Sequence, residues 1–281
     1  MNSYSFKADA EMVQQIVDYF NGEYTTDLEK YIAYRINGNG ANITIYTSGS
    51  VVTQGKNAQQ YYLLFNNRQI VLPQAGSDEV GTGDYFGPIC VCASYIDDGI
   101  YAKIADLHID DSKKLTDEYM LSIEKTLVDN VPHSLLVLDN ALYNKVTSCN
   151  NMNSIKAKMH NQAYVNLINK GIELPQLKVV DDFCGEDKYY KYIADEENVV
   201  KGLTFQVRAE SSYVSVAASS IMSRCAFLKT IDKYSKIYNM QFPKGAGEQV
   251  DIFAKEFLAK YGEDELKKVA KLNFKNTKKL I

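Results

Sequence analysis

Apolar residues near the start of the chain recur every three to four positions. Those between residues 12 and 20 share one face of an expected helix, which Asn21 and Gly22 end. A second helix is expected at residues 28–36. Residues 61–64 (Tyr-Tyr-Leu-Leu) fit a helix and a strand equally well, and their spacing does not decide between the two.

The spacing then changes to every second position. Residues 41–46 alternate between apolar and polar side chains, and a turn at 47–50 leads to a hairpin partner at 51–54. Residues 66–77 contain Pro73 and few periodic apolar positions, so we expect a linker there. The pattern predicts a small α+β domain of about the first 70 residues.

A larger domain is expected after this linker, which divides the chain into residues 1–70 and 71–281. Residues 89–95 are almost continuously apolar, as in a strand that is buried on both faces. Further short apolar runs and helical patterns interleave, which indicates an α/β sheet covered by helices. The remaining strands are expected at 135–138 and 177–180, and the helices at 119–128, 155–169, 213–238, 250–261 and 263–270.

Charge is distributed unevenly along the chain. The net charge of -4 and the pI near 5.5 argue against a nucleic-acid binder, because phosphates are contacted mainly by Lys and Arg. Counted by segment, residues 1–72 carry -1, residues 73–228 carry -8 and residues 229–281 carry +5. The basic last segment could follow a phosphate backbone, although a solvated helix face explains it equally well.

Composition and cysteine spacing indicate an ordinary globular protein of the cytoplasm. No apolar run reaches the roughly 18 residues of a membrane span, and the first twenty residues lack the apolar core of a secretory signal. The five cysteines show no Cys-x-x-Cys spacing, so we expect free thiols in a reducing compartment rather than a zinc site.

Four carboxylates stand where a sheet and its helices would bring them together. Asp78 and Glu79 precede the expected strand at 89–95, and Asp181 ends the run 177–180, at the strand end where open α/β sheets place ligands. Glu210 precedes a helix whose first turns carry small residues. Carboxylate oxygens without a Cys/His set suit Mg²⁺ or Mn²⁺. By their spacing alone, these acids also fit solvated turns or helix caps.

The segment GSDEVGTGDYFGP (76–88) resembles the opening active-site motif of the ribonuclease HIII family. In that motif Gly-Thr-Gly follows the acidic pair, where the related ribonuclease HII has Gly-Arg-Gly. The similarity continues in family order through most of residues 76–281. Its further motifs are DDSKKLT (110–116), YNKVTSCNNMNSIKAKMHNQA (143–163), VVDDF (179–183), AESSYVSVAASSIMSR (209–224), FPKGAG (242–247) and VAKLNFKNTKK (269–279).

A shorter resemblance concerns the N-terminal domain. SGSVVTQGK (48–56) looks like the hairpin of the family's TATA-box-binding-protein-like domain, which binds substrate. Ser50 stands where a Lys is usual and Thr53 where an aromatic residue is usual. The fold class implied is α/β: a ribonuclease H-like central mixed sheet flanked by helices, preceded by a small α+β TATA-box-binding-protein-like domain.

The resemblance implies an endoribonuclease that hydrolyses the RNA strand of RNA/DNA hybrids, leaving 5′-phosphate and 3′-hydroxyl ends. Two divalent ions, Mg²⁺ or Mn²⁺, would be bound by the catalytic residues. Asp181 is preferred to Asp182 because the family's aspartate directly follows two apolar strand residues. The catalytic and metal-binding residues carried over are Asp78, Glu79, Asp181 and Glu210.

The resemblance also suggests which residues contact the substrate. The glycines of Gly81-Thr82-Gly83 would let the backbone approach the sugar, although they also fit a tight turn. Ser112, Lys113 and Lys114 are candidates for phosphate contacts. His160 is expected to have a hydrogen-bonded structural role.

Two alternatives compete with this assignment. One is ribonuclease HII-like cleavage at a single ribonucleotide embedded in duplex DNA, which Thr82 and Glu210 argue against. The other is a catalytically silent hybrid-binding module, which the presence of all four carboxylates argues against. We expect a cytoplasmic monomer that has no contact with a membrane.

Overall fold

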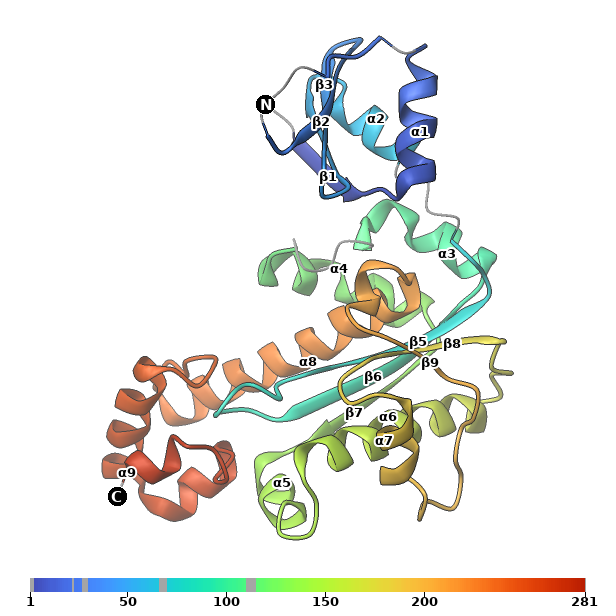
Figure 1. Ribbon diagram of the computed structural model, residues 1–281. Coiled ribbons are helices and arrows are strands. Elements are labelled where there is room, and N and C mark those ends of the chain that lie inside the picture. Colours follow the sequence, from blue (N-terminus) through green and yellow to red (C-terminus); the bar gives the residue numbers. More distant parts are fainter. Residues whose placement is uncertain (1–2, 22, 27–29, 66–69, 110–114, 281) are drawn as a thin grey trace. The chain divides into compact units, whose positions relative to one another are not determined.

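The chain folds into two compact units, residues 1–69 and residues 70–281 (Figure 1). The computed structural model describes residues 3–21, 23–26, 30–65, 70–109 and 115–280.

The first unit is a four-stranded antiparallel sheet with two helices on one face (Figure 1). The strand order is β1-β4-β3-β2. Ile43, Ile45 and Val51 face the helices and are buried with Ile16 of the first helix. The elements are β1 (Ser3–Lys7), α1 (Ala10–Tyr19), β2 (Ile32–Gly38), β3 (Ala41–Tyr46), β4 (Ser50–Gly55) and α2 (Ala58–Phe65).

The structure decides two sequence expectations in this unit. The helix expected at 28–36 is wrong: residues 32–38 form β2, because pairing with β3 outweighs a weak helical spacing. The ambiguous segment 61–64 lies in α2. Thr53 is fully buried and donates to the carbonyl of Ala58 at 3.0 Å, so it faces the helices.

The second unit contains a five-stranded mixed sheet in the order β7-β6-β5-β8-β9. β5 pairs antiparallel with β6 and parallel with β8, so β5 occupies the centre of the sheet. This arrangement confirms the expected mixed sheet. The strands are β5 (Gln74–Val80), β6 (Ile89–Ile96), β7 (His133–Leu138), β8 (Leu177–Asp181) and β9 (Thr204–Gln206).

Helices cover both faces of this sheet (Figure 1). Cys92 and Ala93 are consecutive in β6 and point to opposite faces: Cys92 packs in the cluster that contains Ala218 of α8, and Ala93 in the cluster that contains Ala157 of α6. The helices are α3 (Asp98–Ile104), α4 (Asp117–Asn130), α5 (Asn140–Val146), α6 (Met152–Asn169), α7 (Glu186–Tyr192), α8 (Val214–Tyr238) and α9 (Glu248–Val269). The sequence left open whether residues 213–238 form one helix or two; α8 is one continuous helix that begins after Tyr213.

Small residues let α8 lie directly on the central strand. A Cβ atom at Gly76 would come within 2.5 Å of the Ser215 hydroxyl and the Val216 nitrogen. The hydroxyls of Ser219 and Ser223 donate to the carbonyls of Gly76 and Asp78 at 2.8 and 3.3 Å. The strand that carries the acidic pair is therefore fixed along its length by α8.

The expected linker is too long at its C-terminal end. β5 begins at Gln74, inside the segment 66–77, and residues 66–69 lie outside the described part of the chain. The segment hides its strand because Gly76, Ser77 and Asp78 are small or polar although they are buried. Asp78 and Glu79 consequently lie within β5, and not in a loop between the linker and the strand at 89–95.

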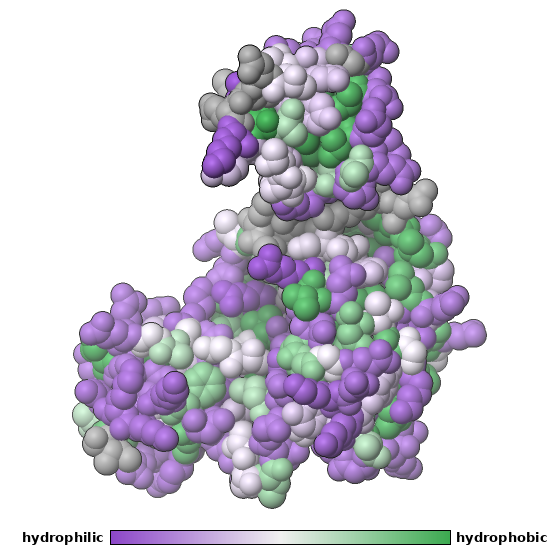
Figure 2. Space-filling view, viewed as in Figure 1, coloured by the Kyte–Doolittle hydropathy of each residue, from purple (hydrophilic) through white to green (hydrophobic). Residues whose placement is uncertain are grey.

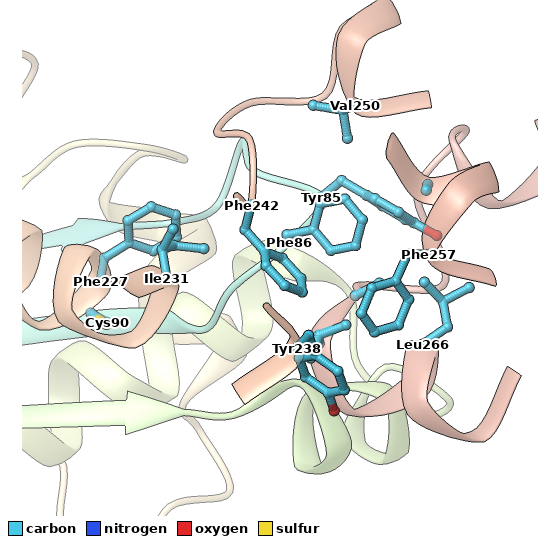
Figure 3. Close-up of a cluster of buried hydrophobic side chains, with 13 residues drawn as sticks. Tyr85, Phe86, Cys90, Phe227, Ile231, Tyr238, Phe242, Val250, Phe257 and Leu266 are labelled. Carbon is cyan, nitrogen blue, oxygen red and sulfur yellow. The ribbon is translucent and has the colours of Figure 1, made fainter. Parts of the chain in front are cut away.

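The C-terminal segment packs through aromatic side chains. Figure 3 shows Phe86, Phe242 and Phe257 close together, and the ring centroids of Phe86 and Phe242 are 5.2 Å apart. Lys271 is fully buried there and donates to the carbonyls of Asp84 and Gly87 at 2.8 and 2.5 Å. These contacts fix the loop that follows the acidic pair.

The end of the chain bends where the sequence suggested two helices. Gly262 interrupts α9 with φ 80°, between the two helical patterns expected there. None of the described helices is long and apolar enough to cross a membrane. The face drawn in Figure 2 is mostly hydrophilic, with apolar residues in small scattered groups.

Candidate active site

The acidic pair lies on the central strand, with its two side chains on opposite faces. Consecutive strand residues alternate, so Asp78 points toward α8, where the Ser220 hydroxyl bonds to it, and Glu79 points toward α6. The Asp78 carboxylate also accepts from the backbone N–H of Glu79 at 2.7 Å. Pairing with β6 continues through both residues, while pairing with β8 ends one residue earlier, at Ser77.

β8 positions the other two carboxylates, Asp181 and Glu210, near the acidic pair. β8 runs parallel to β5, so its last residue, Asp181, lies at the same edge of the sheet as the acidic pair. The Asp181 carboxylate accepts from the Ala209 N–H at 2.9 Å and so anchors the short 3-10 helix η3 (Ala209–Ser211), which contains the buried Glu210. Arg208 turns the chain into this helix with φ 60°.

All four predicted carboxylates line one cavity of about 410 Å³. The structure thus brings together residues that are up to 132 positions apart in the chain. The other lining residues are Val80, Leu115, Asp117, Met120, Ser220 and Arg224.

The electrostatics of the acidic pair are strongly asymmetric. Burial, with the negative charges of Glu79 and Asp181, raises the pKa of Asp78 well above its usual value. Burial also acts to raise the pKa of Glu79, but bonds and charges from His160 and Lys156 outweigh it and lower this pKa. The surroundings therefore disfavour the charged form of Asp78 on balance, whereas those of Glu79 favour its charged form.

The donor set fits a hard divalent cation. Four carboxylates supply only oxygen ligands, which Mg²⁺ and Mn²⁺ prefer, and a cation would relieve the repulsion at Asp78. Within the described residues, no three His, Cys, Asp or Glu side chains are already close enough to hold an ion as they stand. Both Glu79 oxygens bond instead to side chains of α6.

Of the residues predicted to contact substrate, the structure gives a packing reason for Gly81 but not for Gly83. At Gly81, with φ 96°, a Cβ would lie 2.1 Å from the Pro88 carbonyl, so the fold itself requires this glycine. Gly83 is exposed and a Cβ there would meet nothing within 4 Å, so packing does not require this one. Thr82 is half-buried. Ser112, Lys113 and Lys114 lie outside the described residues.

Sequence reasoning missed a charged cluster on the cavity wall. The Asp117 carboxylate accepts from Arg224 Nε at 2.9 Å and from Lys244 Nζ at 2.5 Å, and these cations lower the pKa of Asp117. The three residues come from α4, α8 and the loop before α9. Arg224 and Lys244 each stand in a motif quoted above, but no sequence spacing links them to Asp117, so that contact depends on the fold.

The family becomes clear from comparison with known proteins. The model of the family "Ribonuclease HII" matches residues 75–277, which include all four carboxylates. Ribonuclease HIII of Streptococcus mutans is 36% identical over 99% of this chain and 97% of its own length. The chain belongs to the ribonuclease HIII family. A crystal structure of Bst-RNase HIII in complex with Mn²⁺ has a TM-score of 0.75 and 35% identity, covering 99% of this chain and 98% of that one.

The ribonuclease HIII resemblance read from the motifs is thereby confirmed, together with the fold class. The more distant ribonuclease H2 of Pyrococcus horikoshii OT3 shares the fold at 21% identity, with a TM-score of 0.63 over 74% of this chain and 97% of that one. A domain family of unknown function, DUF3378, matches residues 4–76. Ribonuclease HIII membership therefore covers both units, whereas the likeness to ribonuclease H2 covers three quarters of the chain.

Proposed function

We propose that this protein is an endoribonuclease that hydrolyses the RNA strand of RNA/DNA hybrids and leaves 5′-phosphate and 3′-hydroxyl ends. The observation that carries the proposal is the meeting of Asp78, Glu79, Asp181 and Glu210 at one cavity, in a chain of the ribonuclease HIII family. In this proposal these four carboxylates are the catalytic residues.

The same four residues would hold two divalent ions, Mg²⁺ or Mn²⁺. When bound, two such ions activate the attacking water and stabilise the departing oxygen of the phosphodiester. Asp78, on the central strand, and Asp181, bonded to the backbone at Ala209, contribute fixed oxygens. A general-base histidine is not needed for this chemistry.

Selectivity for RNA is assigned to the loop after the acidic pair. The exposed Gly83 leaves its backbone accessible to a ribose 2′-hydroxyl, and the half-buried Thr82 stands beside it. Gly81 belongs to the proposed contact through its backbone, which close packing against Pro88 holds in place. We assign phosphate contacts to Ser112, Lys113 and Lys114.

Residues 1–70 are proposed as the substrate-binding domain and residues 71–281 as the catalytic domain. The two compact units and the two family matches support this division. In the first unit, the sheet face opposite the helices carries small and polar side chains suited to a nucleic-acid backbone. Those that are half-buried or exposed include Ser3, Ser5, Lys7, Arg35, Asn37, Asn42, Thr44, Ser50 and Gln54.

The interpretation of this surface depends on Ser50 rather than Thr53. Ser50 lies on the open face, so the loss of a Lys there removes a positive charge from the proposed substrate surface. Thr53 lies in the core, where its change from an aromatic residue alters packing only. We further propose that the protein works as a cytoplasmic monomer; its five free cysteines fit a reducing compartment.

The substrate preference tests the proposal. An RNA/DNA hybrid with an uninterrupted RNA strand is expected to give a kcat/KM at least about 10-fold above that of duplex DNA with one ribonucleotide. Labelled substrates of equal length and sequence, compared at the same salt and Mn²⁺ concentrations, provide the measurement. The opposite preference would indicate ribonuclease HII-like cleavage, and binding of the hybrid without cleavage of either substrate would indicate a silent binding module.

A further inference from the structure

The Glu79 carboxylate is held by two side chains one turn apart on α6. Lys156 Nζ donates to Oε1 at 2.8 Å, and His160 Nε2 lies 2.8 Å from Oε2. The positions differ by four residues, which places both on one helix face. All three side chains are nearly excluded from solvent, with 9, 0 and 11% exposure for Lys156, His160 and Glu79.

Each holding side chain is itself fixed by neighbours. His160 Nδ1 lies 2.8 Å from the Ser77 hydroxyl, which is two residues before Glu79 on the same face of β5. The His160 ring stacks on Phe183 with centroids 5.4 Å apart, and Lys156 Nζ lies 3.9 Å from the centroid of the same ring. The carboxylate therefore has one defined orientation rather than several rotamers.

Fold stability alone gives little reason for this arrangement. Buried ion pairs contribute little net stability, because the cost of removing both charges from water offsets their attraction. A packed apolar pair would stabilise the contact between α6 and β5 equally well. The polar arrangement instead fixes the position of the Glu79 carboxylate. Each of its oxygens accepts one hydrogen bond and keeps a second lone pair. Glu79 also lines the cavity.

We propose that Lys156 and His160 are positioning residues, which fix the Glu79 carboxylate at the cavity wall and thereby set the affinity of the site for divalent ions. The two residues bond to Glu79 and are not among the residues that line the cavity, so in this proposal they act through that carboxylate. This inference rests on the proposed function, since it assigns Glu79 to metal binding.

Mn²⁺ binding to the full chain, measured by isothermal titration calorimetry without substrate, tests this role. We expect Lys156→Met and His160→Leu each to weaken Mn²⁺ binding about 10- to 100-fold, as removal of groups that orient metal ligands does. Lys156→Arg and His160→Gln keep a donor toward the same oxygen and are expected to bind Mn²⁺ within about 3-fold of the unmodified protein. A Kd that is unchanged or tighter in Lys156→Met would overturn the proposal.

Two controls separate this role from a general loss of structure. Lys158→Met removes a lysine of the same helix that pairs with Asp195 and Glu196 on the surface, and it should leave the Kd unchanged. Glu79→Gln combined with Lys156→Met should bind no more weakly than Glu79→Gln alone, because the lysine acts through Glu79. Additive losses would contradict the proposal.

A second variant covers the case in which Lys156→Met does not fold. The glutamine of Lys156→Gln keeps a polar side chain but is one bond shorter than lysine, so its amide does not reach Glu79 Oε1 as Nζ does at 2.8 Å. We expect its Kd to be weaker by about 10-fold; an unchanged Kd would again overturn the proposal. Failure of the proposed function gives a different result: the unmodified protein would bind Mn²⁺ with the predicted dependence on Lys156 and yet leave the hybrid uncut.

Discussion

Replacing Asp78 with asparagine is expected to lower hybrid cleavage on the order of 10³-fold or more. Asparagine has nearly the same shape, so the strand and its bond to the Ser220 hydroxyl can persist while one metal-binding charge is lost. Initial rates on a hybrid substrate at saturating Mg²⁺ or Mn²⁺ measure the effect. Full retention of metal-dependent cleavage would remove Asp78 from the site.

Stability measurements test whether such a loss is caused by unfolding. The substitution removes like-charge repulsion from Glu79 and Asp181, so in EDTA at neutral pH the variant should unfold at the same temperature as the unmodified protein or a higher one. Asp187→Asn provides the matched control. Asp187 is exposed in the first turn of α7, and its substitution should leave both the rate and the unfolding temperature unchanged.

The second large effect distinguishes two adjacent aspartates. Asp181→Asn is expected to reduce cleavage by about 10²- to 10³-fold, whereas Asp182→Asn should stay within about 3-fold of the unmodified protein. Asp181 lines the cavity. Asp182 instead accepts from the N–H groups of Cys184 and Gly185 at 3.0 and 2.7 Å, which fixes the turn before α7.

The two variants are well matched because asparagine keeps an acceptor oxygen at both positions. In Asp181→Asn the new side chain could still accept from the Ala209 N–H. In Asp182→Asn it could still accept from the N–H groups that Asp182 now binds, so both variants should fold normally. Charge is then the property that differs between them and the unmodified protein. Kinetics of both variants on one hybrid substrate give the answer, and the reverse order of activities would show that Asp182 is the catalytic residue.

The sequence predicted the parts of the fold that depend on local pattern. The strands at 41–46 and 89–95 were recognisable because one alternates and the other is buried on both faces. Local signals also mark helix ends: Thr116 is the N-cap of α4, and Gly171 has a positive φ in the turn after α6. These signals need only neighbouring residues.

What the sequence could not predict depends on pairing between distant segments. β2 was mistaken for a helix because its strand character comes from β3. The start of β5 was hidden because close contact with α8 requires Gly76, and because the buried Asp78, which lines the cavity, is charged. A packing glycine and a buried carboxylate thus disrupted the local pattern of this strand.

The site itself was only partly predictable. The motifs indicated the four carboxylates, and His160 was expected to form a structural hydrogen bond. That its partners are Glu79 and Ser77, and that Lys156 shares Glu79, follows from the packing of α6 on β5. A Lys and a His four residues apart on the inner face of a helix were the available signal.

The most direct test of the metal site is an anomalous difference map from crystals of the full chain grown with Mn²⁺. We expect peaks in the cavity, with Mn²⁺ within about 2.5 Å of carboxylate oxygens from Asp78 and at least two of Glu79, Asp181 and Glu210. Anomalous peaks that lie elsewhere, with none at these carboxylates, would contradict the assignment of the four residues to metal binding.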